Sequence, residues 1–219
     1  GLYDAMRQVA GNTLGGIEHS WKEGLPNLYC GVGSVILATL FLTCKDVKWR
    51  DKILSVLLLL FFMVSFIIRQ LDYIWHGFHF TNMIPYRFSF LFSFVVLYMA
   101  YHAWTLRDSF RLWQLLLAGG AAALLMYASQ SRTDTVFLAF NVGFSLAYLA
   151  ALAYSLPGRT PKPAEDQEEP DPEEMLAYEQ NLAQKRRYGS ACLLAIFALE
   201  LAMNILCFGL RFAFTYNRN

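Results

Sequence analysis

The chain has 219 residues, of which 56% are apolar and 16% charged, and its net charge is +1. Soluble domains average about 45–50% apolar and about 25% charged residues, and here the apolar residues lie in long blocks. The composition argues against a soluble enzyme and a disordered chain, and the near-neutral charge argues against a nucleic-acid-binding protein. It predicts a polytopic membrane protein, with the lipid bilayer as its first partner.

Six apolar segments are long enough, or nearly so, to cross a hydrocarbon core, which takes about 17–25 helical residues. Their approximate bounds are 28–44, 53–75, 88–104, 112–129, 136–156 and 188–214. Each is expected to be helical, because a single strand in lipid would leave its backbone N–H and C=O groups unpaired. The predicted fold class is therefore all-α: a polytopic transmembrane helix bundle of six spans.

Basic residues give the orientation, because they gather in cytoplasmic loops. The loops 45–52 and 185–187 are strongly basic, whereas 76–87 and 130–135 are poor in Lys and Arg. This pattern places the N-terminus of the chain outside, with residues 1–27 as an extracytoplasmic loop. Spans one to five then occupy 28–156, with 76–87 as an outer loop.

Residues 157–187 interrupt the apolar pattern. Five of the seven prolines and an acidic run at 165–174 lie here. Such a composition cannot bury enough apolar surface to become ordered. We predict a flexible acidic cytoplasmic linker between spans five and six, with a short helix from about Pro172. Residues 188–219 then form span six and its outer end.

The outer loop is rich in groups that bind polar ligands. Arg87 lies beside aromatic rings at an expected helix N-terminus, where its guanidinium and free N–H groups suit a phosphate. The other candidate binding residues of this region are Trp75, His76, His79, Asn82 and Tyr86. The alternative is an aromatic belt in which Arg87 reaches lipid headgroups. The two histidines have no nearby third ligand, so no metal site is predicted.

Two further polar features need an explanation. Asn27 and Tyr29 lie in a turn just before the first span, and both are candidate binding residues. Glu200 and Asn204 lie in the sixth span, four residues apart, and therefore on one helix face. Either they form an interhelical hydrogen bond or they are part of a polar cavity.

Two motifs together resemble the bacterial YfhO membrane-protein family. The first is Gly24-Leu25-Pro26-Asn27-Leu28-Tyr29-Cys30-Gly31. The second runs from Trp75-His76-Gly77-Phe78-His79 through Asn82 to Pro85-Tyr86-Arg87-Phe88. Glu200 with Asn204 is also similar to that family.

The resemblance implies an activity. Members are longer, with about a dozen or more spans, and are similar to GT-C glycosyltransferases of the bacterial plasma membrane. They are associated with transferring a sugar from a polyprenyl-phosphate donor to a cell-envelope polymer such as lipoteichoic acid. This chain would then be an internal piece, inactive alone, with the acidic catalytic residue upstream of Gly1.

In that interpretation Arg87 binds the phosphate, and His76 or His79 contacts phosphate or hydroxyl groups. Tyr86 and Trp75 stack on the sugar or line a lipid groove. No cofactor is evident; a divalent metal belongs, if anywhere, to the longer protein. Two alternatives stay open: a transporter or flippase whose path is lined by Glu200, Asn204 and Asn141, and a membrane scaffold without chemistry.

Overall fold

The computed structural model describes residues 28–79, 86–129, 135–158, 161 and 171–216. Its elements are α2 (Val32–Thr43), α3 (Trp49–Ser65), α4 (Arg69–Trp75), α5 (Ser89–Thr105), the short 3-10 helix η1 (Arg107–Ser109), α6 (Leu112–Ser129), α7 (Thr135–Ser155) and α8 (Pro172–Tyr216). These ranges contain no strand, which confirms the all-α prediction for the part of the chain described.

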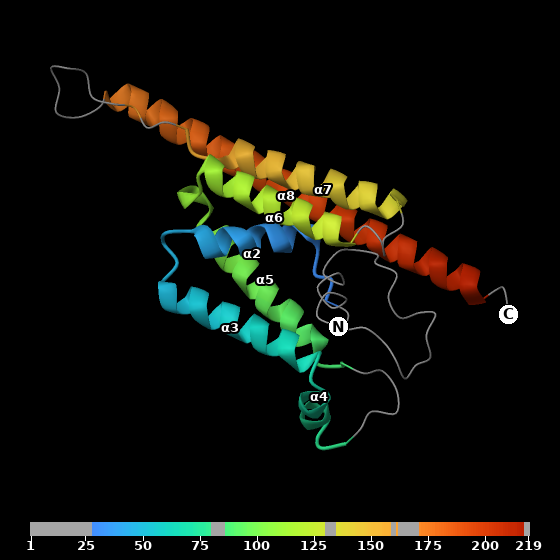
Figure 1. Cartoon of the computed structure of the whole chain (residues 1–219). Coiled ribbons are helices and arrows are strands. Elements are labelled where there is room, and N and C mark those ends of the chain that lie inside the picture. Colours follow the sequence, from blue (N-terminus) through green and yellow to red (C-terminus); the bar gives the residue numbers. More distant parts are fainter. Residues whose placement is uncertain (1–27, 80–85, 130–134, 159–160, 162–170, 217–219) are drawn as a thin grey trace.

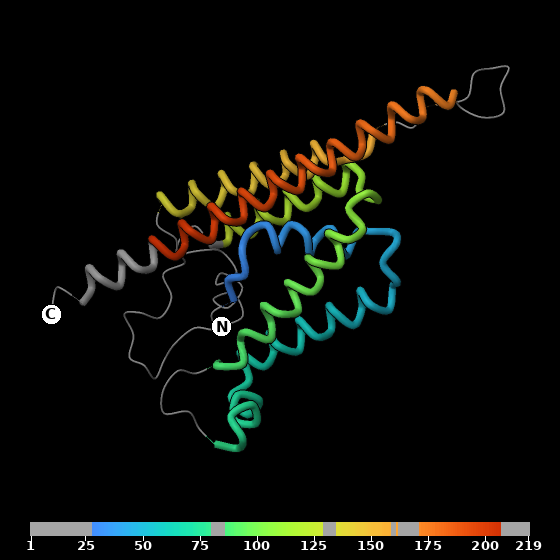
Figure 2. The backbone as a smooth tube through the Cα atoms, turned by 180° about the vertical axis from the view of Figure 1, so that it is seen from behind, coloured from blue at the N-terminus to red at the C-terminus, as the bar shows by residue number. Residues whose placement is uncertain are grey.

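Helix α2 is the centre of the bundle. It packs against α5, α6 and α7, while α3 lies along α5 and α8 lies along α7 (Figure 1). Consecutive long helices run in opposite directions, so the starts of α2, α5 and α7 share one end of the bundle with the last turns of α3 and α6 (Figure 2). The site residues discussed below come from this end.

The core forms because α2 is apolar around most of its circumference, and such a helix has to be covered by others. Ile36, Leu40 and Phe41 of α2 are fully buried, and Met99 and Ala103 of α5 are almost or fully inaccessible. In lipid, this packing is stabilised by the van der Waals contacts between closely fitting side chains. Large exposed Leu and Phe side chains cover the outward faces of α3, α5, α6 and α8, as expected for a surface that faces lipid.

The helices are apolar, but they do not all have the length of a span. Thr135–Ser155 and Pro172–Leu206 are long and apolar enough to cross a membrane, and the bent pair α3 and α4 passes the same test if taken together. Val32–Thr43, Ser89–Thr105 and Leu112–Ala128 are shorter apolar helices. The count of six spans therefore stays a prediction.

The second predicted span, 53–75, is not one helix. α3 ends at Ser65, and α4 begins at Arg69 at an angle of 103° to it. The backbone of Ile68 is extended, with φ −90° and ψ 108°, which breaks the helical hydrogen-bond ladder. The bend turns the polar residues of α4 away from the direction of apolar α3.

The predicted linker, 157–187, is only partly described. Its last segment belongs to α8, which runs without a break from Pro172 to Tyr216 and projects past the bundle (Figure 1). At 1.5 Å per residue, 45 residues extend about 68 Å, more than twice the roughly 30 Å of a hydrocarbon core. Helix α8 therefore carries both the predicted basic membrane entry and the sixth span.

Polar contacts join three helices at the basic end of the bundle. The Gln114 side-chain amide donates to the Thr43 carbonyl over 2.8 Å, and the Arg186 guanidinium holds the Asp108 carboxylate through two N···O distances of 2.9 Å. The Ser109 hydroxyl also donates to Asp46. These contacts connect the end of α2, the start of α6 and the interior of α8, the last of them through η1.

Candidate functional site

Glu200 is a buried carboxylate between three helices. Its side chain is in α8, with a residue exposure of 2%. Oε1 accepts hydrogen bonds from the Tyr29 hydroxyl at 2.5 Å and the Val32 backbone N–H at 2.7 Å, and Oε2 accepts one from the Tyr148 hydroxyl at 2.8 Å. These three hydrogen bonds tie α8 to α2 and α7.

Val32 is the first residue of α2, whose N–H has no partner within its own helix. The N-cap residue, Gly31, supplies no side-chain hydrogen bond. Glu200 therefore caps α2 from another helix, and its Oε1 lies at the positive end of the α2 dipole.

Asn204 completes the cluster from the same face of α8. Its Nδ2 donates to the Tyr29 hydroxyl and to the Glu200 carbonyl, both over 2.8 Å. The four-residue spacing of Glu200 and Asn204 thus places both side chains around one tyrosine. We name Tyr29, Tyr148, Glu200 and Asn204 the Glu200 cluster.

Tyr148 is absent from the residues that the sequence pattern singles out. It lies in apolar α7 among other aromatic residues, and no spacing marks it. Its ring packs on Gly33 of α2, where an added Cβ would lie 2.6 Å from the Tyr148 ring. Only glycine allows α2 and the ring to approach this closely.

The Trp-His-Gly-Phe motif terminates α4. Gly77, with φ +68°, donates its N–H to the Ile74 carbonyl, and Phe78 donates to the Tyr73 carbonyl, each over 3.0 Å. The rings of Phe78 and Tyr73 meet edge to face at 5.9 Å. These are the two hydrogen bonds and the apolar contact of a Schellman C-cap.

His76 is oriented by Asp72, one turn earlier in α4. Its Nδ1 lies 2.8 Å from the Asp72 carbonyl oxygen and 3.3 Å from Asp72 Oδ1. The Asp72 carbonyl oxygen can only accept, so Nδ1 carries the proton of this hydrogen bond. Nε2 is buried and has no hydrogen-bond partner among the described residues.

Phe88 brings the start of α5 to the end of α4. Its ring stacks on Trp75 at 4.9 Å with an interplanar angle of 14°, and it meets the His76 ring at 6.3 Å. Arg87, the preceding residue, is exposed. The fold therefore places Trp75, His76 and Arg87 at one corner of the bundle, which we call the α4–α5 corner.

Tyr86 also belongs to the α4–α5 corner. It adopts φ +62°, a conformation that non-glycine residues rarely occupy, and its ring meets Phe66 edge to face at 5.9 Å. Burial and then the Asp72 carboxylate raise the pKa of Tyr86 above its ordinary value, while Arg69 opposes them. Its hydroxyl is therefore neutral at physiological pH and can donate a hydrogen bond.

The predicted binding residues do not form one group. Tyr29 joins the Glu200 cluster on α2, α7 and α8, whereas Trp75, His76, Tyr86 and Arg87 lie where α4 meets α5 (Figure 1). His79 is exposed beyond the C-cap of α4. Asn27 and Asn82 lie outside the described residues. No three His, Cys, Asp or Glu side chains within the described ranges are grouped so that they could hold a metal ion.

Comparison with known proteins gives one match. The model of a family described as bacterial membrane protein YfhO matches residues 3–212. No curated protein and no solved structure matches the chain. The matched region includes both the Glu200 cluster and the α4–α5 corner.

Proposed function

We propose that this chain, which belongs to the bacterial YfhO membrane-protein family, is part of a GT-C-like glycosyltransferase. The enzyme would transfer a sugar from a polyprenyl-phosphate donor to a cell-envelope polymer such as lipoteichoic acid. Its substrate site would lie at the α4–α5 corner, on the extracytoplasmic side of the plasma membrane, with the chain crossing the membrane six times.

The observation that carries this proposal is the state of His76. Its ring is fixed by Asp72, yet Nε2 is buried and lacks a hydrogen-bond partner among the described residues. A buried polar atom without a partner costs about 1–3 kcal/mol. Such a cost is offset when a ligand hydroxyl supplies the hydrogen bond, and a sugar presents several hydroxyls.

The reaction needs a cation near the departing phosphate. Transfer breaks the bond between the sugar C1 and a donor phosphate oxygen, and forms a C1–oxygen bond to an acceptor hydroxyl. The hydroxyl proton passes to an acidic residue that acts as the base. Negative charge builds on the polyprenyl phosphate, and exposed Arg87 beside His76 is suited to stabilise it.

The transporter alternative depends on Glu200 lining a water-filled path. Glu200 is 2% exposed and accepts three hydrogen bonds. A carboxylate satisfied in this way supports a role in holding helices together. The scaffold alternative leaves the unsatisfied His76 Nε2 without an explanation.

Substitution in the full-length protein tests the proposal. Replacing one group that stabilises transition-state charge lowers a rate by about 10²–10³, so Arg87→Ala should reduce polymer glycosylation by that factor at an unchanged membrane level of the protein. His76→Ala should reduce it as well, but less.

Two matched substitutions serve as controls. Arg50→Ala removes an exposed arginine at the opposite end of α3, and His102→Ala removes a histidine that packs on Phe41. Both should leave glycosylation intact. Normal glycosylation in Arg87→Ala and His76→Ala would exclude the α4–α5 corner as the site.

A further inference from the structure

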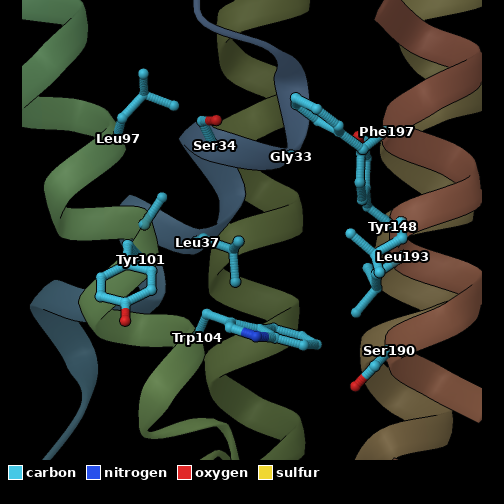
Figure 3. A pocket seen from close by; sticks show the side chains of 12 residues that line it. Gly33, Ser34, Leu37, Leu97, Tyr101, Trp104, Tyr148, Ser190, Leu193 and Phe197 are labelled. Atoms are coloured by element: carbon cyan, nitrogen blue, oxygen red, sulfur yellow. The ribbon is translucent and has the colours of Figure 1, made fainter. Parts of the chain in front are cut away.

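An apolar groove of about 450 Å³ separates α5 from α8. Its floor is formed by α2, and its back by Tyr148 of α7; Figure 3 shows Leu97 and Phe197 toward one end and Trp104 and Ser190 at the other. The floor residues Gly33 and Ser34 are buried, whereas Leu97, Tyr101, Leu194 and Phe197 on the rim are exposed, and Trp104 and Ser190 are half-buried. The groove exists because α8 packs along α7 and α5 packs along α2, which leaves α5 and α8 with little or no direct packing against each other.

The groove extends over about two thirds of the depth of one membrane leaflet. On α5 it runs from Leu97 to Trp104, and on α8 from Ser190 to Phe197. At 1.5 Å per residue, each stretch is about 10 Å long, compared with about 15 Å for half of a 30 Å hydrocarbon core. The Trp104 end faces the basic end of the bundle, so the groove lies in the leaflet on that side.

Positive charge surrounds the Trp104 end. The Arg107 guanidinium lies over the Trp104 ring at 4.6 Å, and its Nε is buried without a hydrogen-bond partner in the part of the chain described. Lys185 and exposed Arg187 come one turn before Ser190 on α8. Arg186 is paired with Asp108, so the other three basic side chains leave this end positively charged.

We propose that the groove binds one acyl chain of an anionic phospholipid from the cytoplasmic leaflet, with its phosphate at Arg107, Arg187 and Ser190. The lipid chain fills the space between α5 and α8, which lie on the two sides of the groove. An anionic phospholipid matches both parts of the site, because its acyl chain suits the apolar groove and its phosphate suits the basic side chains at the Trp104 end. The proposal does not depend on the transferase activity.

Photo-crosslinking tests the proposal in the full-length protein. The protein is placed in phosphatidylcholine nanodiscs that contain a small fraction of phosphatidylglycerol or phosphatidylcholine, each with the same diazirine-bearing acyl chain. We expect labelling by phosphatidylglycerol to concentrate on peptides that contain 97–104 and 190–197. It should exceed labelling by phosphatidylcholine by about fivefold for each basic side chain at the anionic headgroup, Arg107 and Arg187.

Two sets of variants test the acyl-chain groove and the headgroup site separately. Ala100→Trp fills the groove, and Leu194→Trp narrows it from the exposed rim with less effect on folding; both should lower labelling severalfold. Leu116→Trp, at an equally exposed position on α6, should not. Arg107→Gln should lower the preference for phosphatidylglycerol about fivefold, while Arg50→Gln, near the same end of the bundle, should keep it.

Three results would overturn the proposal. Equal labelling by the two lipids in the unsubstituted protein would exclude a headgroup site. Labelling spread evenly over exposed α6 and the groove would exclude an acyl-chain site. Strong labelling at α6 without labelling at 97–104 would mean that another part of the protein or a second copy covers the groove.

Discussion

The Tyr29 hydroxyl donates a 2.5 Å hydrogen bond to Glu200, linking residues 171 positions apart in the chain. Through this contact and the Val32 N–H, the last described helix holds the entry to the first. The segment that precedes Tyr29 carries the Gly-Leu-Pro-Asn motif. The Glu200 cluster holds Tyr29 in place, and Tyr29 follows the motif by only two positions in the chain.

We predict that Glu200→Ala strongly destabilises the bundle. It leaves Tyr29, Tyr148 and Val32 without an acceptor in an apolar environment, and each orphaned donor costs about 1–3 kcal/mol. The free energy of unfolding, measured by denaturant titration in detergent micelles, should fall by about 3 kcal/mol or more.

Glu200→Gln and Glu179→Ala complete that test. The amide of Gln keeps one acceptor oxygen, and its NH₂ can donate to Tyr148, so the loss should be about 1 kcal/mol. Glu179 is exposed on the same helix, and its replacement should change stability by no more than about 0.5 kcal/mol. If Glu200→Ala and Glu179→Ala behaved alike, the cluster would have no structural role.

Gly33→Ala should be destabilising for a steric reason. Its Cβ would lie 2.6 Å from the Tyr148 ring, which is itself held by Glu200. Overpacking of a well-filled site costs about 1–3 kcal/mol. Thermal unfolding of the purified protein should show a lower midpoint.

The matched control is Gly120→Ala in α6, where a Cβ would meet nothing within 4 Å. Alanine has the better helix propensity by about 1 kcal/mol, so this variant should be neutral or more stable. The double variant Gly33→Ala/Tyr148→Leu removes the opposing ring and should recover part of the loss; no recovery would point away from the ring as the cause.

The regular part of the fold follows from hydropathy. Segments predicted at 112–129 and 136–156 occur as α6 (Leu112–Ser129) and α7 (Thr135–Ser155), because long apolar runs in lipid have few alternatives to helix. The bend between α3 and α4 is not readable in the same way, since Phe66, Ile67 and Ile68 are as apolar as a helix interior.

The candidate sites are also only partly predictable from the sequence. The four-residue spacing of Glu200 and Asn204 shows that they share a face, but not which face or which partners. Tyr148, 52 positions from Glu200, is found only through tertiary packing. His76 and Asp72 are readable as a helical pair, whereas the buried Nε2 depends on how Phe88 and its neighbours cover the ring.

The cost of substituting Gly77 should depend only on how readily the new residue adopts the left-handed backbone conformation of this position. Its φ is +68°, and a Cβ there would meet nothing within 4 Å. Gly77→Val places a β-branched residue in the left-handed region, at a cost above the roughly 1–2 kcal/mol of an ordinary side chain, whereas Gly77→Asn should be milder. Hydrogen exchange of residues 73–78 should become faster in Gly77→Val only; equal exchange in both variants would contradict the C-cap.

The Arg186–Asp108 pair should contribute little to stability despite its good geometry. Both N···O distances are 2.9 Å, but the side chains are 39% and 44% exposed. Exposed pairs contribute about 0–1 kcal/mol, because water and salt screen the attraction. A double-mutant cycle of Arg186→Gln and Asp108→Asn should therefore give a coupling energy below about 1 kcal/mol that decreases further in high salt. A coupling above about 2 kcal/mol, unchanged by salt, would mean that the pair is shielded from water and that the basic end of the bundle is more tightly closed than these exposures indicate.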